Sequence, residues 1–337
     1  MANFSNTFEA NPGSASSNRE DLTDVLTILA PEETPILSSA NKQKASATFV
    51  EWTVDSLAAP ATAGIREGQD VDFDVASSDK FAARARLGNY TQKFRRQYKV
   101  SDLQEAVDSV GPAKIAQAEA KSIRELKRDI EATISGTQDL DQEDGTNPYV
   151  LRGLGSWISS SAQASQPVPN AFLTPAGSIA DVTVAEGEFA ESELNDLITS
   201  IFGVTGSSNN LMLVADTALR RDISDFARIA GASENSVRNV NYDGGAGSIK
   251  LSVDLYQSDH GVVSVVNANP DCAPTQAGIS GMSGYLINPD YYGIHELIPM
   301  GSTRLPNDGG GEKGYVDCAL TLGVYHPGAH GKIVSTT

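Results

Sequence analysis

Hydrophobic and polar positions alternate along two segments of the first hundred residues, which predicts two long β-strands. In residues 49–55, Val50, Trp52 and Val54 share one face, and the other face is mostly polar. The second segment runs from about residue 83 to residue 100, with aromatic side chains on one face and mostly basic ones on the other. Its apolar face consists of Tyr90, Phe94, Tyr98 and Val100. Together the two segments predict an extended β-hairpin.

The stretch that joins these strands, about residues 56 to 82, shows no periodic pattern of hydrophobic residues, and it contains Pro60, Gly64 and Gly68. It also carries an acidic cluster near its middle. The cluster consists of Glu67, Asp70, Asp72 and Asp74. A structureless loop of this length is uncommon inside a compact domain. We therefore expect a loop that is either mobile or ordered by something outside the subunit.

A helical period follows these strands. Residues 101–104 have the form of a capping box, which predicts a short helix that ends near Gly111. Pro112 and Gly136 suit the first turn and the end of a second helix, which at 1.5 Å per residue would be roughly 35 Å long. Its apolar stripe is Ile115, Ile123, Leu126, Ile130 and Ile134. Its opposite face is charged and comprises Lys121, Arg124, Glu125, Lys127, Arg128 and Glu131. The pattern predicts a spine helix from about Pro112 to Ser135.

The second half of the chain has the pattern of a mixed α/β domain, and the whole chain is therefore assigned to the α+β class. Helices are expected at 189–202 and, after the capping residue Asp216, at 217–228. Strands are expected at 211–215, 248–253, 261–266, 285–287 and 315–325. Residues 1–45 have weak patterns: a short helix is expected at 21–29, and residues 34–37 are expected to be extended. An arm that reaches over a neighbour and a loose terminus both fit this N-terminal segment.

Charge is distributed unevenly along the 337 residues, whose formal net charge is −18. Residues 80–128 contain 12 Lys and Arg against 5 Asp and Glu, a net charge of +7, so the rest of the chain carries −25. The acidic total argues against a sequence-specific nucleic-acid binder, which usually presents a basic face. The basic segment is either a solvated face or one half of a charge-complementary contact between copies of the chain.

Motifs of catalysis and cofactor binding do not appear at the required spacing. The G-x-G-x-x-G match at residues 309–314 has turn formers before it and a strand after it, so it is expected to be a loop. The acidic residues 139–145 lack the spacing of a calcium loop, and His326 and His330 are separated by turn formers. Cys272 and Cys318 are expected to be buried thiols. We therefore expect no catalytic, cofactor-binding or metal-binding residues. With no secretion signal and no apolar run of about 18 residues, the chain is expected to fold and work in a cytoplasm.

The order of these features resembles that of the major capsid proteins of tailed phages, with the Hong Kong ninety-seven type of fold. Within these proteins, the chain looks like the branch of elongated-head podovirus capsid proteins in particular. The resemblance extends over nearly the whole chain. The matching segments are residues 33–37, 51–57, 67–68, 97–101, 125–131, 213–216 and 321–331. The chain departs from the type member in having no long scaffolding segment before the arm. No residue can be matched to the covalent Lys–Asn crosslink of the type member.

The resemblance implies a division of the chain into five parts. These are an N-terminal arm (1–45), an extended loop over the neighbouring subunit (46–100), a peripheral domain with the spine helix (101–185), an axial domain (186–300) and a return strand of the peripheral domain (301–337). It implies a structural protein of the virion that assembles with itself into hexamers and pentamers around double-stranded DNA, without sequence-specific contacts. A portal, a separate scaffold protein and, in some shells, a decoration protein would be its further partners.

Ten residues are candidates for contacts between subunits. Trp52 is expected to pack between subunits or against the base of the loop. The acidic loop tip is expected to meet basic residues of another copy. The candidates are Trp52, Glu67, Asp70, Asp72, Asp74, Lys93, Arg95, Lys99, Arg124 and Arg128. Two other functions stay open from the sequence: a decoration, tail or adhesin component of a virion, and a cytosolic hydrolase whose site lacks a known motif.

Overall fold

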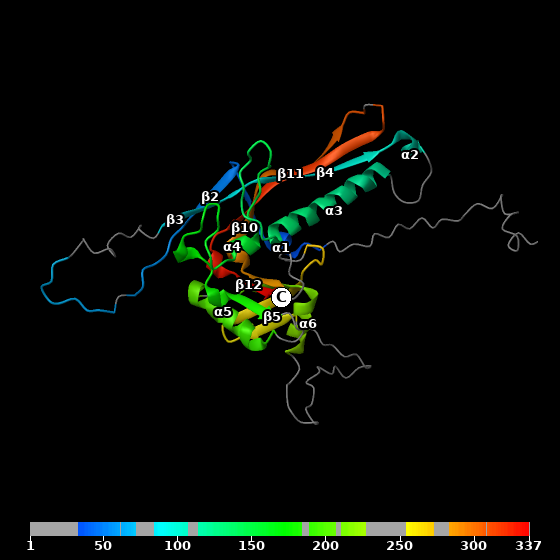
Figure 1. The fold of residues 1–337 in the computed structure, drawn as a ribbon. Coiled ribbons are helices and arrows are strands. Elements are labelled where there is room, and N and C mark those ends of the chain that lie inside the picture. The colour runs from blue at the N-terminus through cyan, green and yellow to red at the C-terminus, as the bar shows by residue number, and fades with distance from the viewer. Residues whose placement is uncertain are drawn as a thin grey trace, which may run out of the picture.

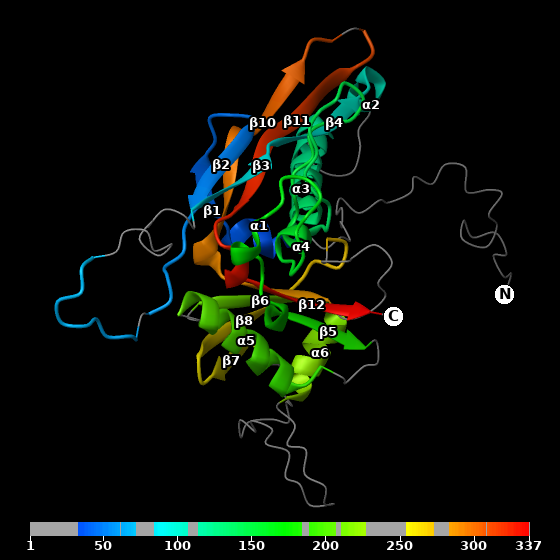
Figure 2. The ribbon, with the colours of Figure 1, turned by 60° about the vertical axis from the view of Figure 1, so that its left-hand side comes forward.

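Two large β-sheets, each with helices packed on it, form the protein in the computed structural model (Figure 1). The structure describes residues 33–60, 62–71, 84–106, 114–183, 189–206, 210–226, 254–272, 283–307 and 309–336. The predicted helix at 21–29 and the predicted strand at 248–253 lie outside these residues. Figure 2 shows an elongated lobe built on a four-stranded sheet above a second lobe built on a six-stranded sheet.

The four-stranded sheet, called the long sheet below, has the strand order β1-β10-β11-β4. It comprises β1 (Asn41–Lys44), β10 (Tyr292–Leu305), β11 (Glu312–Val324) and β4 (Gln92–Val100). β1 is parallel to β10, and the other pairs are antiparallel. The sequence predicted β11 and the β4 segment. It did not predict β10, in which Pro299 and Gly301 interrupt the alternation and the pairing register shifts.

The spine helix, α3 (Lys114–Ser135), lies along one face of the long sheet (Figures 1 and 2). Leu126, Ile130 and Ile134 are fully buried, and Ile115 and Ile123 are half-buried. The predicted helix and its apolar stripe are therefore confirmed for the described residues. One residue was placed wrongly: Glu131, assigned to the charged outer face, is only 2% exposed.

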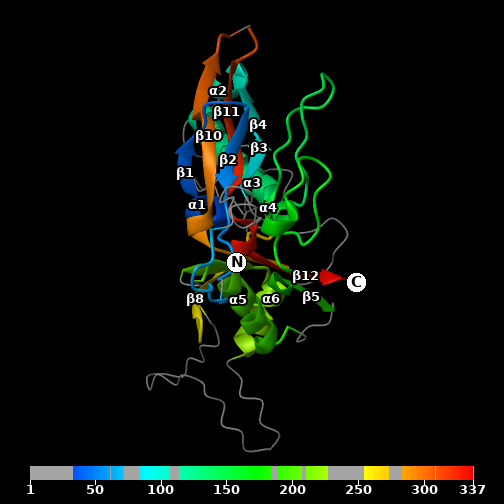
Figure 3. The ribbon, with the colours of Figure 1, turned by 90° about the vertical axis from the view of Figure 1, so that its left-hand side faces the viewer.

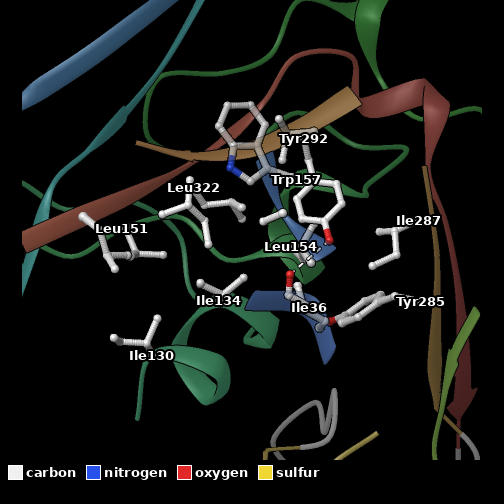
Figure 4. Close-up of a cluster of buried hydrophobic side chains, with 14 of the residues drawn as sticks. Ile36, Ile130, Ile134, Leu151, Leu154, Trp157, Tyr285, Ile287, Tyr292 and Leu322 are labelled. Atoms are coloured by element: carbon white, nitrogen blue, oxygen red, sulfur yellow. Dashed lines mark hydrogen bonds between the residues drawn. The ribbon is translucent and has the colours of Figure 1, made fainter. Parts of the chain in front are cut away.

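The largest core lies between the spine helix, the long sheet and α4 (Leu154–Trp157). Figure 4 shows Ile130 and Ile134 of the helix around the same space as Leu154, Trp157 and Tyr292. Burial of apolar side chains of this size contributes about 1.5–3 kcal/mol each, so this cluster is the main source of stability for the elongated lobe.

The six-stranded sheet has the order β5-β12-β9-β6-β8-β7. Its strands are β5 (Ile179–Thr183), β12 (Gly331–Thr336), β9 (Gly284–Ile287), β6 (Leu211–Ala215), β8 (Gly261–Asn267) and β7 (Leu255–Ser258). Helices α5 (Glu191–Thr205) and α6 (Thr217–Asp225) pack against it and share a second core (Figure 3). Helices α5 and α6 and strands β6, β8 and β9 were predicted. Asp216 occupies the N-cap of α6 but makes no capping hydrogen bond, contrary to its expected role.

The predicted strand at 83–100 is in fact two strands that belong to different sheets. β3 (Ala85–Tyr90) pairs with β2 (Phe49–Val54) in a two-stranded sheet, while β4 pairs with β11. The break is at Thr91, whose backbone N–H donates to the Thr48 carbonyl at 2.7 Å. Because the apolar alternation continues through Thr91, the pattern could not reveal the change of partner.

Short elements connect these parts of the fold. They are α1 (Pro35–Ser39), α2 (Asp102–Ala106) and four 3-10 turns at Asn170–Phe172, Ala176–Ser178, Pro289–Tyr291 and Pro327–Ala329. The predicted cap of α2 is confirmed, since the Ser101 hydroxyl accepts the Gln104 N–H at 3.2 Å. In the segment at 309–314, which was expected to be a loop, residues 309–311 lie in the turn before β11, whereas residues 312–314 already belong to β11 and pair with β4. Residues 34–37 were expected to be extended and instead contain the start of α1.

Candidate assembly interface

An extended loop leaves the elongated lobe at the end of the β2–β3 pair. Its described residues, 55–60 and 62–71, project away from both lobes in Figures 1 and 2. Asp55 and Arg84 form an ion pair of 3.2 Å at its base. Three large apolar side chains along it are mostly exposed: Leu57 at 99%, Ile65 at 83% and Val71 at 76%. Among the described residues, none of the same subunit covers these side chains.

The acidic cluster is partly described. Both Glu67 and Asp70 are exposed. Glu67 lies within a turn in which Gly68 has a φ of 76° and the Gln69 N–H donates to the Arg66 carbonyl at 3.1 Å, and Asp70 follows this turn. Asp72 and Asp74 lie outside the described residues. The described part of the tip therefore presents two carboxylates to solvent, as a contact with another copy would require.

Trp52 lies at the base of the loop and packs within its own subunit. Its ring is 5.6 Å from the ring of Trp157, 6.1 Å from that of Tyr325 and 6.4 Å from that of His295, to which it is nearly parallel. It is half-buried against the main core. These contacts correspond to the expected placement at the loop base; packing between subunits stays a prediction.

The basic residues of β4 lie on the face of the long sheet away from the spine helix. Strand alternation puts Lys93, Arg95 and Lys99 on this face, whereas Arg96 points to the helix and pairs with Asp129 at 2.5 Å. Asp317 of β11 pairs with both Lys93, at 3.2 Å, and Arg95, at 3.4 Å. One carboxylate between two cations leaves this face with a positive charge.

Arg124 and Arg128, the other two basic candidates, are on the spine helix and so on the opposite side of the sheet. Arg128 already pairs with Asp271 of its own chain. The structure therefore separates the five predicted basic residues into two groups, and a single acidic tip cannot contact both.

Glu131 is a buried structural residue, although the sequence pattern assigned it to the charged face of the spine helix. Its carboxylate accepts the N–H of Ile36 at 2.9 Å and that of Leu37 at 2.8 Å. These are orphan donors at the start of α1, whose Thr34 makes no side-chain cap. Burial raises the pKa of Glu131, and the two N–H bonds oppose that rise. Glu131 thus fixes α1, within the last part of the expected N-terminal arm, to the spine helix.

Arg152 is a second buried charge that the sequence did not single out. Its guanidinium donates to Asp139 at 2.7 Å, to the Gln166 carbonyl at 3.1 Å and also to the Ser165 carbonyl, and it lies 4.6 Å from the centre of the Trp157 ring. Burial lowers the pKa of Arg152, and Asp139 opposes the shift. Asp139 was considered as part of a calcium-like loop, and here it serves as the counter-ion of this arginine.

The remaining candidates for chemistry are structural. His330 is fully buried and its Nδ1 accepts the Asn288 N–H at 3.2 Å, and burial lowers its pKa to about 4. Cys272 and Cys318 are buried free thiols, as predicted. Across the described ranges, no group of His, Cys, Asp and Glu is arranged to hold a metal ion. No helix among them has the length and apolar character needed to cross a membrane.

Solved structures from phages and GTA particles are similar in fold to this chain over nearly its whole length. The chain is similar to the capsid of Cyanophage P-SCSP1u over 100% of both chains, with a TM-score of 0.58 and 10% identity. For Gordonia phage Cozz, the TM-score is 0.60 and the identity 15%, over 100% of this chain and 97% of that one. For Mycobacterium phage Bobi, the TM-score is 0.61 and the identity 9%, over 97% of this chain and 99% of that one. The fold is thus that of tailed-phage capsid subunits of the Hong Kong ninety-seven type.

The sequence identifies the family within this class. Residues 2–337 match the profile of the SU10 major capsid protein family, and the chain belongs to that family. A search of curated protein sequences finds no match. The family is one of structural capsid proteins, so the chain is a major capsid subunit and part of the virion, and the prediction of a shell-building protein rather than an enzyme is confirmed.

Proposed function

We propose that this subunit assembles with itself into the hexamers and pentamers of an icosahedral tailed-phage head that encloses double-stranded DNA. The observation that supports this most directly is the extended loop, whose exposed Leu57, Ile65 and Val71 have no cover in their own subunit among the described residues. A second copy that lies beneath the loop would bury them. Rings of such copies need contacts between two different surfaces, which close on themselves when the rotation is right.

Each part of the chain has a role in this proposal. Residues 1–45 act as an arm, and the β2–β3 pair with its projecting loop lies over the neighbour. The elongated lobe acts as the peripheral domain, and the lobe of the six-stranded sheet acts as the axial domain near the ring centre. Since β5 and β12 belong to the six-stranded sheet and β10 begins at Tyr292 in the long sheet, the domain bounds expected from the sequence (101–185, 186–300 and 301–337) shift accordingly. Glu131 and the residues of α1 would set where the arm leaves the subunit. Assembly in the host cytoplasm, a portal, a separate scaffold protein and a decoration protein belong to the same proposal.

The acidic loop tip is proposed to contact the basic face of β4 in a neighbouring copy. Of the predicted partners, Lys93, Arg95 and Lys99 share one exposed face and form the receiving group. Arg124 and Arg128 are on the other side of the sheet and are not needed for this contact. The acidic total charge also suits a shell that holds DNA without binding it tightly, since phosphate contacts would add strong salt-dependent affinity.

Electron microscopy tests the assembly. The chain would be expressed alone and together with the head genes that neighbour its own gene, and the particles would be imaged. Closed shells with five-fold and six-fold rings are the expected result in at least one of the two preparations. Monomers or a single small ring in both would contradict the proposal and favour a decoration or tail protein.

A further inference from the structure

β4 forms one edge of the long sheet. It pairs with β11 over residues 92–100, and no other strand of the described chain lies on its outer side. An edge of nine residues offers unpaired backbone N–H and C=O groups to a further strand. A lysine-rich edge strand can also serve only to prevent unwanted pairing, so the edge alone does not identify a partner.

The outward face beside this edge is basic and hollowed. Arg95, Lys99 and Lys313 line a groove of about 370 Å³ together with the side chains of Tyr315 and Leu305. Arg95 lies over the Tyr315 ring at 4.7 Å from its centre, which holds the guanidinium along the strand. On this outward face of β4, Lys93, Arg95 and Lys99 are charged, and neutral Gln97 lies between Arg95 and Lys99.

The chain contains one segment with the complementary pattern. Residues 70–75 read Asp-Val-Asp-Phe-Asp-Val, so an extended backbone would put the three aspartates on one face and the three apolar residues on the other. Asp70 and Val71, the two described members, are both exposed, and they lie on the projecting loop. Residues 72–75 lie outside the described residues. The six-residue segment fits within the nine-residue edge of β4 and complements it in period and in charge.

We propose that residues 70–75 of a second copy add to the free edge of β4 as a fifth strand of the long sheet. Backbone hydrogen bonds hold the added strand, and cross-strand charge pairs set its register. With Asp72 opposite Gln97, Asp70 and Asp74 lie opposite Arg95 and Lys99 whether the added strand is parallel or antiparallel. On the opposite face of the sheet, one of Val71 and Phe73 then lies opposite Tyr98 and the other lies opposite Arg96. This inference rests on the proposed function and specifies how the loop engages its neighbour.

Cysteine scanning across two copies tests the strand. One population of subunits carries Gln97→Cys, and a second, with a size tag, carries one cysteine at each of positions 70 to 75 in turn. Gln97 is exposed and uncharged, so its replacement leaves the charges of the groove intact. The natural Cys272 and Cys318 are buried, and burial raises the pKa of each thiol, so they contribute little background. Mixed shells are oxidised with copper phenanthroline and run on a non-reducing gel.

The expected result is a disulfide-linked dimer of one tagged and one untagged subunit, with a yield that alternates along the scan. Positions 70, 72 and 74 should exceed their neighbours 71, 73 and 75 at least about five-fold, with the maximum at position 72. Equal yields at odd and even positions, or no heterodimer in intact shells, would overturn the inference and leave the proposed function standing. Absence of shells from wild-type subunits would contradict the proposed function itself. A scan variant that fails to assemble alone is tested in shells diluted with wild-type subunits.

Discussion

Two buried charges, Glu131 and Arg152, hold separate segments of the chain together. Glu131 connects the spine helix to α1, 95 residues earlier. Arg152 connects the segment after the helix to the carbonyls of Ser165 and Gln166. Neither residue stands out in a one-dimensional pattern, because each was surrounded by ordinary charged or apolar neighbours. Their roles depend on the three-dimensional positions of backbone groups, which periodicity does not encode.

Glu131→Ala should lower the free energy of unfolding by about 1–3 kcal/mol, because the buried N–H groups of Ile36 and Leu37 lose their acceptor. Glu131→Gln keeps one carbonyl acceptor and serves as the matched control, with a smaller loss. Urea unfolding of both variants measures the difference. Equal stability of the alanine variant and the wild type would show that water satisfies these donors and that the contact does not fix α1.

The stability difference between wild type and Glu131→Gln should depend on pH. Since burial raises the pKa of Glu131 above its unfolded value near 4.5, the folded state binds the proton more tightly. The associated stability is fully present below the unfolded pKa and is lost as pH rises through the folded pKa. Wild type should therefore gain relative to the glutamine variant as pH falls from neutral towards 4.5. A difference that is constant over this range would contradict the buried ionisation.

Arg152→Lys should cost about 3–5 kcal/mol, although it keeps the charge. An ammonium cannot reach Asp139 and both carbonyls at once, and it cannot stack on Trp157 as a planar guanidinium does. Arg84→Lys is the comparison, since its ion pair with Asp55 is exposed and worth about 0–1 kcal/mol. Chemical unfolding curves of the two variants should differ clearly in midpoint. Similar midpoints would mean that the Arg152 network is not a source of stability.

At the scale of elements, the sequence predicted those whose period is long and uninterrupted. The spine helix, β2, β6, β8, β9 and β11 were found at their positions, because an amphipathic stripe or an apolar run marks each of them. β10 was missed where Pro299 and Gly301 break the alternation, and α1 was missed because its cap comes from Glu131. The split between β3 and β4 left no trace in the pattern, since only the pairing partner changes at Thr91.

The apolar stripe of the spine helix is half-buried at Ile115 and Ile123 and fully buried from Leu126 to Ile134. The loss of stability caused by a charged substitution should therefore increase along the helix. Ile130→Asp puts an uncompensated charge at a site with no exposure, and it should prevent the accumulation of folded subunits or cost more than about 4 kcal/mol. Ile123 is half-buried, so Ile123→Asp should cost several kcal/mol less than Ile130→Asp. Soluble yield and thermal unfolding report both effects. A normal Ile130→Asp subunit would show that the stripe is not packed.

At the scale of the whole molecule, the loop and the basic face of β4 lie on different parts of one subunit, as a head-to-tail contact between copies requires. The sequence supplied the residue types of this candidate interface and their charges. The sequence did not reveal on which face of the long sheet each residue lies. For that reason the prediction grouped Arg124 and Arg128 with Lys93, Arg95 and Lys99. Strand pairing and the position of the spine helix separate them.

Replacement of Asp70, Asp72 and Asp74 together by Asn should slow assembly and flatten its dependence on ionic strength. Exposed pairs contribute only about 0–1 kcal/mol each, so one substitution should do little, but the contact recurs at every subunit boundary. Salt screens such charges over about 10 Å at 0.1 M, and wild-type assembly should therefore slow as salt is added. Light scattering at several salt concentrations measures both rates.

Glu143→Gln, an exposed change on another loop, is the control and should assemble like wild type. If the triple variant keeps the wild-type rate and salt dependence, or if an assembled structure puts this tip more than about 10 Å from every Lys and Arg of other copies, the charge contact does not exist.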